Sequence, residues 1–179
     1  MFRLDKRDIA ILKVLSTEGR ITKAELANRV NLSPTPCWER LKRLEQAGII
    51  EGYGAHISLR ALGPHITVFV AIELESHKAE HFQRFEIAVQ KRPEVRWAWA
   101  LGGGFDYLLQ IVTTDIDAYQ RMIDELLDAR IGLARYYTYV VTKPVKAEHA
   151  PPFEILMGSD LAAAGKGHAG KTGKEENGS

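Results

Sequence analysis

The stretch LSPTPCWERLKRLEQAGII at residues 32–50 predicts a helix with a well-marked start and end. Ser33 can cap the free amides of the first turn, and Pro34 fits the next position, where its missing amide would be unpaired anyway. Gly48 is the residue type that ends many helices. One apolar face recurs at intervals of four and three residues and comprises Cys37, Leu41 and Leu44. Taken alone, the basic outer side of this helix fits an ordinary solvated surface as well as it fits DNA.

Two shorter helices are expected before this one. Helical spacing of apolar residues predicts the first at residues 5–16, and Thr22 with Glu25 can form a capping box that opens a second helix ending at Val30. Only residues 31–32 separate the second helix from the third, a turn short enough for a helix-turn-helix. In such a unit the third helix enters the major groove, and residues near its start reach the base edges.

The candidate DNA contacts therefore lie on the third helix. Ser33 marks its start, while Arg40 and Arg43 suit phosphate contacts, which position a protein on DNA without specifying sequence. The residues that we expect to read base edges are Thr35, Pro36, Trp38, Glu39 and Lys42.

Three segments give the chain a resemblance to a known family. They are LDKRDIAILKVLSTEGRIT at residues 4–22, LSPTPCWERLKRLEQAGIIEGY at residues 32–53, and GGFDYLLQIVTTD at residues 103–115. In this order they resemble the Lrp/AsnC (feast/famine) regulators. The resemblance implies a winged helix-turn-helix domain and a second domain that binds an amino acid or related small molecule and assembles dimers, often octamers. The PCWER segment resembles, more narrowly, regulators associated with ectoine catabolism, which says nothing physical about the effector pocket.

Charge is distributed in agreement with DNA binding. The chain has 179 residues, 45% of them hydrophobic, and a net charge of only +1. Residues 1–60 carry 11 Lys and Arg against 7 Asp and Glu, whereas residues 64–150 carry 10 against 12. The basic surplus thus lies with the helix-turn-helix, as a DNA-binding footprint requires, although a surplus of this size also occurs on ordinary surfaces.

Cysteine content and hydropathy indicate a cytoplasmic protein. A single cysteine allows no internal disulfide, which suits a reducing compartment, and Cys37 itself is expected in the helix core. No apolar run approaches the roughly 20 residues that cross a membrane, and the N-terminus does not resemble a signal peptide. We therefore expect a cytoplasmic protein that does not contact the membrane.

Several features that can indicate chemistry are incomplete. His77 and His81 have a spacing that can bind zinc, but no third ligand is evident nearby. The glycines at residues 102–104 are not followed by a helix, so they do not form a dinucleotide fingerprint. No nucleophile has a convincing catalytic partner, although such sets are spatial and the sequence is weak grounds for excluding them. We expect no metal, no cofactor and no enzyme activity.

Four regions are predicted along the chain. Residues 1–48 form the helix-turn-helix domain, and residues 49–63 form a linker strand or wing that carries the hinge. Residues 64–146 form the second domain. Residues 147–179 form a C-terminal extension that we expect to be disordered from about residue 158. Its segment FEILM at residues 153–157 either docks on a neighbouring subunit or is frayed, and the sequence favours neither.

The second domain shows alternating and helical periods in the order strand, helix, strand, strand, helix, strand. This order is typical of the ferredoxin-like α+β fold, whose antiparallel sheet carries both helices on one face. The expected inward residues of the first helix are Phe82, Phe85 and Val89. One face of the second strand is expected to hold Val95, Trp97, Trp99 and Leu101. The last helix, capped by Asp115, is expected to bear the apolar residues Tyr119, Met122, Ile123, Leu126 and Leu127.

The other face of this sheet would be bare in a monomer. Aromatic residues on two strands cannot all lie on the helix side, because some of them share a strand with residues that face the other way: Trp97, Trp99, Tyr137 and Tyr139. A bare apolar face predicts dimerisation.

The three glycines at residues 102–104 suggest a loop that lets the backbone approach a ligand closely. The resemblance implies that the loop ending in Asp106 helps to form an effector pocket at a subunit interface, where backbone amides can bind a carboxylate. The alternative is a flexible hairpin turn in which Asp106 caps its own backbone. The candidate effector residues are Leu101, Gly102, Gly103, Gly104, Asp106 and Tyr107, with Thr138 and Val140 from the last strand.

The predicted function is a DNA-binding transcriptional regulator that responds to an amino acid or related metabolite. Two alternatives stay open at this point: an enzyme like the siroheme decarboxylases, which resemble Lrp/AsnC proteins, and an architectural protein of low sequence specificity. The basic groups Arg40, Lys42 and Arg43 favour the regulator.

Overall fold

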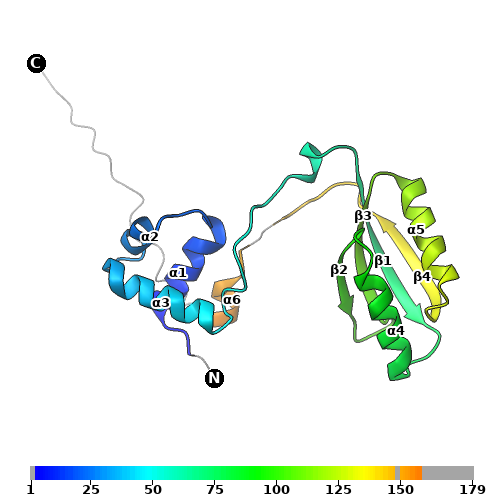
Figure 1. Cartoon of the computed structure of the whole chain (residues 1–179), viewed down its shortest axis with the longest axis horizontal. Helices are drawn as coiled ribbons and strands as arrows, with labels where there is room; N and C mark the ends of the chain where they lie inside the picture. The colour runs from blue at the N-terminus through cyan, green and yellow to red at the C-terminus, as the bar shows by residue number, and fades with distance from the viewer. Residues whose placement is uncertain (1–2, 148–149, 159–179) are drawn as a thin grey trace, which may run out of the picture. The chain divides into compact units, whose positions relative to one another are not determined.

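The computed structural model describes residues 3–147 and 150–158 of the chain (Figure 1). It comprises two compact units, one formed by Met1–His56 with Lys146–Ser179 and the other by Ile57–Val145. The disorder that we predicted beyond residue 158 falls outside the described residues. Among the helices that the structure describes, none has the length and apolar character needed to cross a membrane.

The first unit is a three-helix domain. Helices α1 (Lys6–Thr17), α2 (Lys23–Arg29) and α3 (Pro34–Gln46) enclose a core in which Cys37 is buried, as predicted. A short helix, α6 (Phe153–Met157), belongs to the same unit, and Glu154 on it lies 2.9 Å from the Lys13 ammonium on α1. The FEILM segment is therefore helical and contacts its own chain.

The hydrogen bonds that cap the starts of α1 and α2 differ from those predicted. A complete capping box forms at α1, where the Asp5 carboxylate accepts the Asp8 amide at 2.9 Å and Asp8 accepts the Asp5 amide at 3.1 Å. At α2 the Thr22 hydroxyl accepts the Glu25 amide at 3.2 Å, but Glu25 pairs with Arg29. Only the threonine half of the predicted box is formed there.

The predicted side-chain cap of Ser33 is wrong, although α3 does begin at Pro34. A serine cap accepts amides of the first turn. Pro34 and Pro36 have no amide, so only Thr35 could donate, and the Ser33 side chain makes no capping hydrogen bond. Gly48 adopts φ +67°, a left-handed conformation that suits glycine and ends the helix as predicted.

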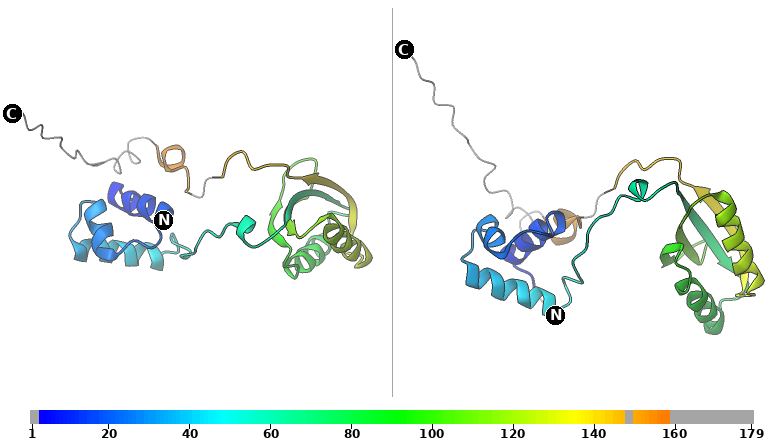
Figure 2. Two further views of the ribbon diagram at one scale, coloured as in Figure 1. Left: turned by 90° about the horizontal axis from the view of Figure 1, so that it is seen from above. Right: turned by 45° about the horizontal axis from the view of Figure 1, so that its top comes forward.

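The second unit has the predicted ferredoxin-like architecture. Its elements are β1 (Ile66–Leu74), α4 (Ala79–Gln90), β2 (Val95–Ala100), β3 (Tyr107–Thr113), α5 (Ile116–Asp128) and β4 (Leu133–Val140). The strands form one antiparallel sheet in the order β2-β3-β1-β4. Both helices cover the same face of the sheet (Figure 2).

Alternation along the strands builds the core beneath these helices. Val68, Val70 and Ile72 of β1 are fully buried against Leu109 and Ile111 of β3. The Asp115 carboxylate caps α5 by accepting the Ala118 amide at 2.7 Å, as predicted. Of the apolar residues of α5, Leu127 is 39% exposed, because it lies at the margin of the apolar face.

A β-bulge corrects the predicted face of β2. Val95 lies opposite Ile111 and packs against the core, whereas Trp97 lies opposite Gln110, so the register shifts between them. The extra residue of the bulge reverses the alternation. Val95 therefore faces the helices, while Trp97 and Trp99 face away from them.

The predicted linker strand is not formed. The structure describes all of residues 49–63 and assigns no strand to them, and a single 3₁₀ turn, η1 (Leu59–Ala61), interrupts the segment. A strand requires a partner for its backbone groups, and the sheet order gives this segment none within one chain.

Candidate DNA-binding and effector-binding sites

The outer face of α3 carries the candidate DNA contacts. Thr35, Glu39 and Lys42 recur at intervals of four and three residues and are exposed, opposite the buried Leu41 and Leu44. The remaining exposed candidates are Ser33, Pro36, Trp38 and Arg43, and Arg40 is half-buried. Contact of these residues with DNA stays a prediction.

Asp8 holds α3 against α1. Its side chain is 0% exposed, and its two carboxylate oxygens lie 2.8 Å from Arg40 Nη1 and 2.7 Å from Arg43 Nη2. Arg40 Nη1 also lies 2.6 Å from Asp5. Burial alone would raise the pKa of Asp5, but the Asp8 amide, Arg40 and the Arg7 amide outweigh it and hold that pKa below its usual range. Arg40 thus orients α3, whereas half of the Arg43 side chain remains accessible.

Two further contacts fix the helix-turn-helix geometry. The Lys23 ammonium on α2 lies 3.2 Å from the ring centroid of Trp38, a cation–π contact on the flank of α3 opposite Arg40. Arg7 donates to the carbonyl oxygen of Val30 at 2.7 Å and so ties α1 to the turn. In that turn Asn31 adopts φ +52°, a left-handed conformation that asparagine tolerates. These contacts therefore help to set the orientation of α3 and of its outer face.

The glycine loop connects β2 and β3. The Leu101 amide donates to the Asp106 carbonyl at 2.8 Å and closes the loop. Within the loop, Gly103 has a φ of +157°, which residues with a side chain rarely adopt. A Cβ added to Gly102, Gly103 or Gly104 would meet no atom within 4 Å. The loop backbone is thus accessible to a ligand from outside.

Asp106 joins this loop to the end of β1. Its Oδ2 accepts the Leu74 amide at 2.7 Å, and its Oδ1 lies 3.1 Å from Nε2 of the exposed His77. The alternative that Asp106 caps its own loop is therefore wrong, because the amide that it accepts belongs to another strand. His77 and His81 contact different carboxylates, Asp106 and Glu80.

The other candidate effector residues lie elsewhere in the unit. Tyr107 is buried beneath α4, where its hydroxyl donates to Glu86 at 2.7 Å, and burial followed by that carboxylate raises the pKa of the tyrosine. On the opposite edge strand, the Thr138 hydroxyl bonds the hydroxyl of Tyr119, and Val140 lies opposite Val68. Within one chain, the structure does not bring Thr138 and Val140 to the glycine loop.

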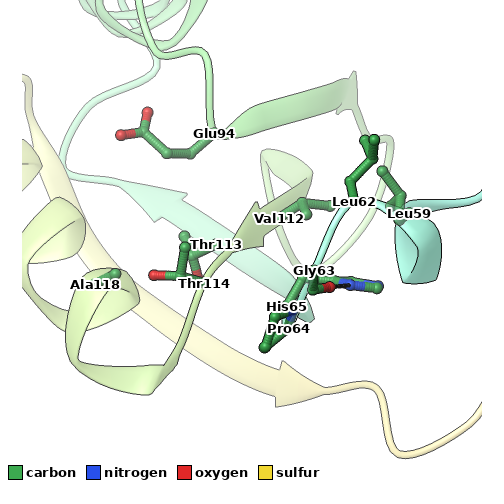
Figure 3. Close-up of a pocket in the computed structure, with 10 residues that line it drawn as sticks. All are labelled: Leu59, Leu62, Gly63, Pro64, His65, Glu94, Val112, Thr113, Thr114 and Ala118. Atoms are coloured by element: carbon green, nitrogen blue, oxygen red, sulfur yellow. Dashed lines mark hydrogen bonds between the residues drawn. The ribbon is translucent and has the colours of Figure 1, made fainter.

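Sequence reasoning missed several residues that shape these sites. The Asp5 and Asp8 spacing is itself a capping signature that would have placed the start of α1. The contacts of Lys23 with Trp38 and of His77 with Asp106 depend on tertiary packing, which no local pattern reports. A further missed feature is a cavity of about 420 Å³ at the end of β3 that leads into α5, partly lined by Glu94 (Figure 3).

Comparison with known proteins places these two units in a family. Residues 4–51 match the model of winged helix-turn-helix DNA-binding domains, and residues 67–151 match that of the Lrp/AsnC ligand binding domain. The chain is 53% identical to the transcriptional regulatory protein DoeX of Halomonas elongata, over 83% of this chain and 94% of that protein. The chain belongs to the Lrp/AsnC family. It is also 42% identical to the leucine-responsive regulatory protein of Escherichia coli, over 80% of this chain and 87% of that protein.

Solved Lrp/AsnC structures share the fold over most of the chain. A transcriptional regulator of Neisseria meningitidis in complex with L-methionine is 37% identical, with a TM-score of 0.80, covering 87% of this chain and 100% of that one. The feast or famine regulatory protein of M. tuberculosis, also with L-methionine, is 25% identical with a TM-score of 0.71, covering 83% and 100%. This Lrp/AsnC protein is thus a DNA-binding transcriptional regulator with a ligand-binding domain. These relatives bear the names of regulators, which favours the regulator over the enzyme alternative.

Proposed function

We propose that this Lrp/AsnC regulator acts in the cytoplasm as a homodimer or larger oligomer, up to an octamer, whose paired α3 helices read DNA under the control of an amino acid or a derivative. The observation that carries the proposal is the sheet face opposite the helices. This aromatic face is composed of Trp97, Trp99, Tyr137 and Tyr139, residues that are 59%, 41%, 44% and 55% exposed.

The aromatic face supports self-association. Trp97 and Trp99 stack in parallel, with centroids 5.9 Å apart, and Phe105 packs edge-on against Tyr137 at 5.3 Å. Such rings are ordered but uncovered, and a large exposed apolar patch is typical of a protein interface. A second copy of the chain offers the same surface, as the interface of a symmetric dimer requires. A dimer also carries two α3 helices, which fits a palindromic operator.

At each half-site, the outer face of α3 supplies the contacts. The Lys42 ammonium can donate to base acceptors such as guanine O6 and N7, and the Thr35 methyl group can pack on a thymine. Arg43, exposed beside them, suits a phosphate. The anchoring of α3 through Asp8 means that binding does not have to order this helix first.

The glycine loop is the proposed effector site. Accessible amides at residues 102–104 can bind a carboxylate, and Oδ1 of Asp106 can accept an ammonium group in place of the exposed His77. Two structural neighbours were solved in complex with L-methionine, which supports a zwitterionic ligand. Thr138 and Val140 would join this site only from another subunit. Binding at such an interface would change the relative placement of the paired α3 helices.

The test combines an effector screen with footprinting. Amino acids, L-methionine among them, should raise the melting temperature of the full chain by differential binding to the folded state. A hit should shift the footprint on a palindromic DNA near the gene, and Gly103→Leu should abolish both responses. The proposal fails if no amino acid or derivative stabilises the protein. Footprints with little sequence preference would support the architectural alternative.

A further inference from the structure

The cavity partly lined by Glu94 lies at the other end of β3 from the glycine loop. It measures about 420 Å³, a volume in the range of small-molecule sites, and is an open pocket bordered by the end of β3, the start of α5 and the linker turn η1 (Figure 3). In Figure 3 the Glu94 carboxylate and Thr114 lie on one side of this space, with Leu59 and Leu62 on the other. All of its lining residues belong to the second unit.

The Glu94 carboxylate is an anomaly among the described residues. Its Oε2 atom is buried and has no hydrogen-bond partner. Arg92, the neighbouring cation in the sequence, pairs with Glu125 and so does not neutralise it. A buried carboxylate oxygen without a donor is unfavourable and calls for a partner that residues 3–147 and 150–158 do not supply.

The other polar groups that line the cavity also present acceptors. The Thr113 hydroxyl donates to the Asp115 carbonyl at 3.0 Å, and the Thr114 hydroxyl donates to the Asp115 carboxylate at 2.9 Å, so each hydroxyl hydrogen is used and the lone pairs remain. Nδ1 of His65 lies 3.1 Å from the Gly63 carbonyl and can only donate to it, so Nε2 is the ring nitrogen that remains for a ligand. The Val112 amide already donates to the Glu94 carbonyl at 2.9 Å.

The remaining wall is apolar and includes exposed linker residues. Leu62 is 73% exposed although it borders the cavity, and Leu59, Pro64 and Val112 extend the same apolar surface. A ligand that fits must therefore bring hydrogen-bond donors and positive charge to one end and hydrocarbon to the other. We propose that this cavity, which we call the hinge cavity, binds a small organic cation with an ammonium group on a short apolar chain.

Occupancy of the hinge cavity would act on the linker. The ammonium group would pair with Glu94, and the hydrocarbon would cover Leu59 and Leu62, which joins the η1 turn to β3 and α5. The linker would then leave the ligand-binding unit from a fixed anchor. The hinge cavity thus offers a second input to the regulator, separate from the glycine loop and selective for cations without a carboxylate.

The test uses n-butylamine as the probe and monitors backbone amides of the full-length protein by NMR. Butylamine should shift the amides of Leu62, Val112 and Thr114, while n-butanol should do so weakly and butyrate should not. Glu94→Gln keeps the shape of the side chain but removes its charge, and should weaken butylamine binding about tenfold or more, as expected for a hydrogen bond to a charged group. Leu62→Ser, a second variant at an exposed position, should weaken binding while preserving the fold.

Glu75→Gln is the matched control, because Glu75 is an exposed carboxylate that does not line the hinge cavity, and it should leave the affinity unchanged. Equal binding of butyrate, or unchanged affinity in Glu94→Gln, would overturn the proposal. The proposal would also be overturned if butylamine did not shift the cavity amides, since a partner subunit or the protein's own side chains would then already fill the space.

Discussion

The two units of this regulator each leave one face uncovered, and the two faces differ in chemistry. On the DNA-binding unit the outer face of α3 carries polar residues such as Thr35 and Lys42, which water solvates until DNA replaces it. On the ligand-binding unit the aromatic face exposes rings that water does not solvate well. The first face is stable in water without DNA, whereas exposure of the second to water is unfavourable and would be relieved in the proposed dimer.

The two faces also differ in what holds them in place. Ion pairs to the buried Asp8 and a cation–π contact at Trp38 fix α3 from both flanks. The aromatic face is fixed by strand pairing and by the bulge that turns Trp97 outward. Polar anchors therefore set the DNA-binding face, while backbone register sets the aromatic face.

Charging the aromatic face should produce the largest effect. The double variant Trp97→Lys with Tyr139→Lys places like charges where two copies would meet, and should weaken dimerisation by at least about 100-fold, given roughly 2 kcal/mol or more for each buried aromatic at an interface. Sedimentation velocity at micromolar concentration should then report a monomer with an unchanged circular dichroism spectrum.

The control for this experiment is Ile87→Lys, because Ile87 is an exposed apolar residue on α4. Its mass in solution should equal that of the unmodified protein. A monomeric unmodified protein would contradict the proposed role of the aromatic face.

Removing the buried carboxylate should loosen the DNA-binding unit alone. Asp8→Asn leaves Arg40 and Arg43 without their buried partner, and should destabilise this unit by about 2 kcal/mol, less than for a fully buried pair because both arginines keep access to water. Hydrogen exchange of the α3 amides should accelerate about 30-fold, while β1 and β3 stay protected. Asp117→Asn on α5 is the control and should not accelerate exchange of the α3 amides. If Asp8→Asn accelerated exchange equally in both units, Asp8 would not act on the DNA-binding unit alone.

Shortening one side chain on the outer face of α3 should weaken DNA binding more modestly. Lys42→Ala removes a donor to base edges and should lower the affinity for the operator about tenfold while lowering non-specific affinity less. Fluorescence anisotropy on both DNAs, at several salt concentrations, measures the difference. Lys91→Ala, on the ligand-binding unit, should change neither affinity, and an equal loss on both DNAs would instead assign Lys42 to phosphate.

The smallest effect concerns acid stability, and it should appear in both units. Asp115 caps α5, and the hydrogen bond from the Ala118 amide, then that from Thr114, lowers its pKa as the capping box lowers that of Asp5. Because the pKa of the carboxylate is lower in the folded protein, the ionised group stabilises the folded state at pH values above its ordinary pKa of 3.8. This stabilisation is lost as the pH falls through the pKa that the group has in the folded protein. Asp115→Asn and Asp5→Asn should therefore lower the melting temperature at pH 7. The difference in melting temperature between each variant and the unmodified protein should narrow towards pH 3. A difference that is independent of pH would contradict this account.

The elements of both units follow from local patterns, and the exceptions have physical causes. Alternation in β1 and β3 and helical spacing in α5 predict their buried faces, because each pattern matches the period of the element. The bulge in β2 adds one residue, which the alternating pattern of the sequence does not reveal. The prediction therefore placed Val95 on the wrong face of the sheet. The cap expected from Ser33 fails because two of the first three helical residues are prolines.

The sites were less predictable than the fold. The positions of Thr35 and Lys42 on α3 follow from helical spacing, and the glycine loop is evident in the sequence. The arginine partners of Asp8 and the partners of Asp106 come from distant parts of the chain, and Oε2 of Glu94 has no partner among the described residues, so only the folded arrangement shows these features.

The prolines at the start of α3 also bear on how the helix can meet DNA. Helix N-termini often grip a phosphate with their free amides. Pro34 and Pro36 leave Thr35 as the sole amide donor among the first three residues of α3, and they put two rigid hydrocarbon rings in place of the others. This end of the helix is thus better suited to fitting the shape and methyl groups of the major groove than to holding the sugar-phosphate backbone.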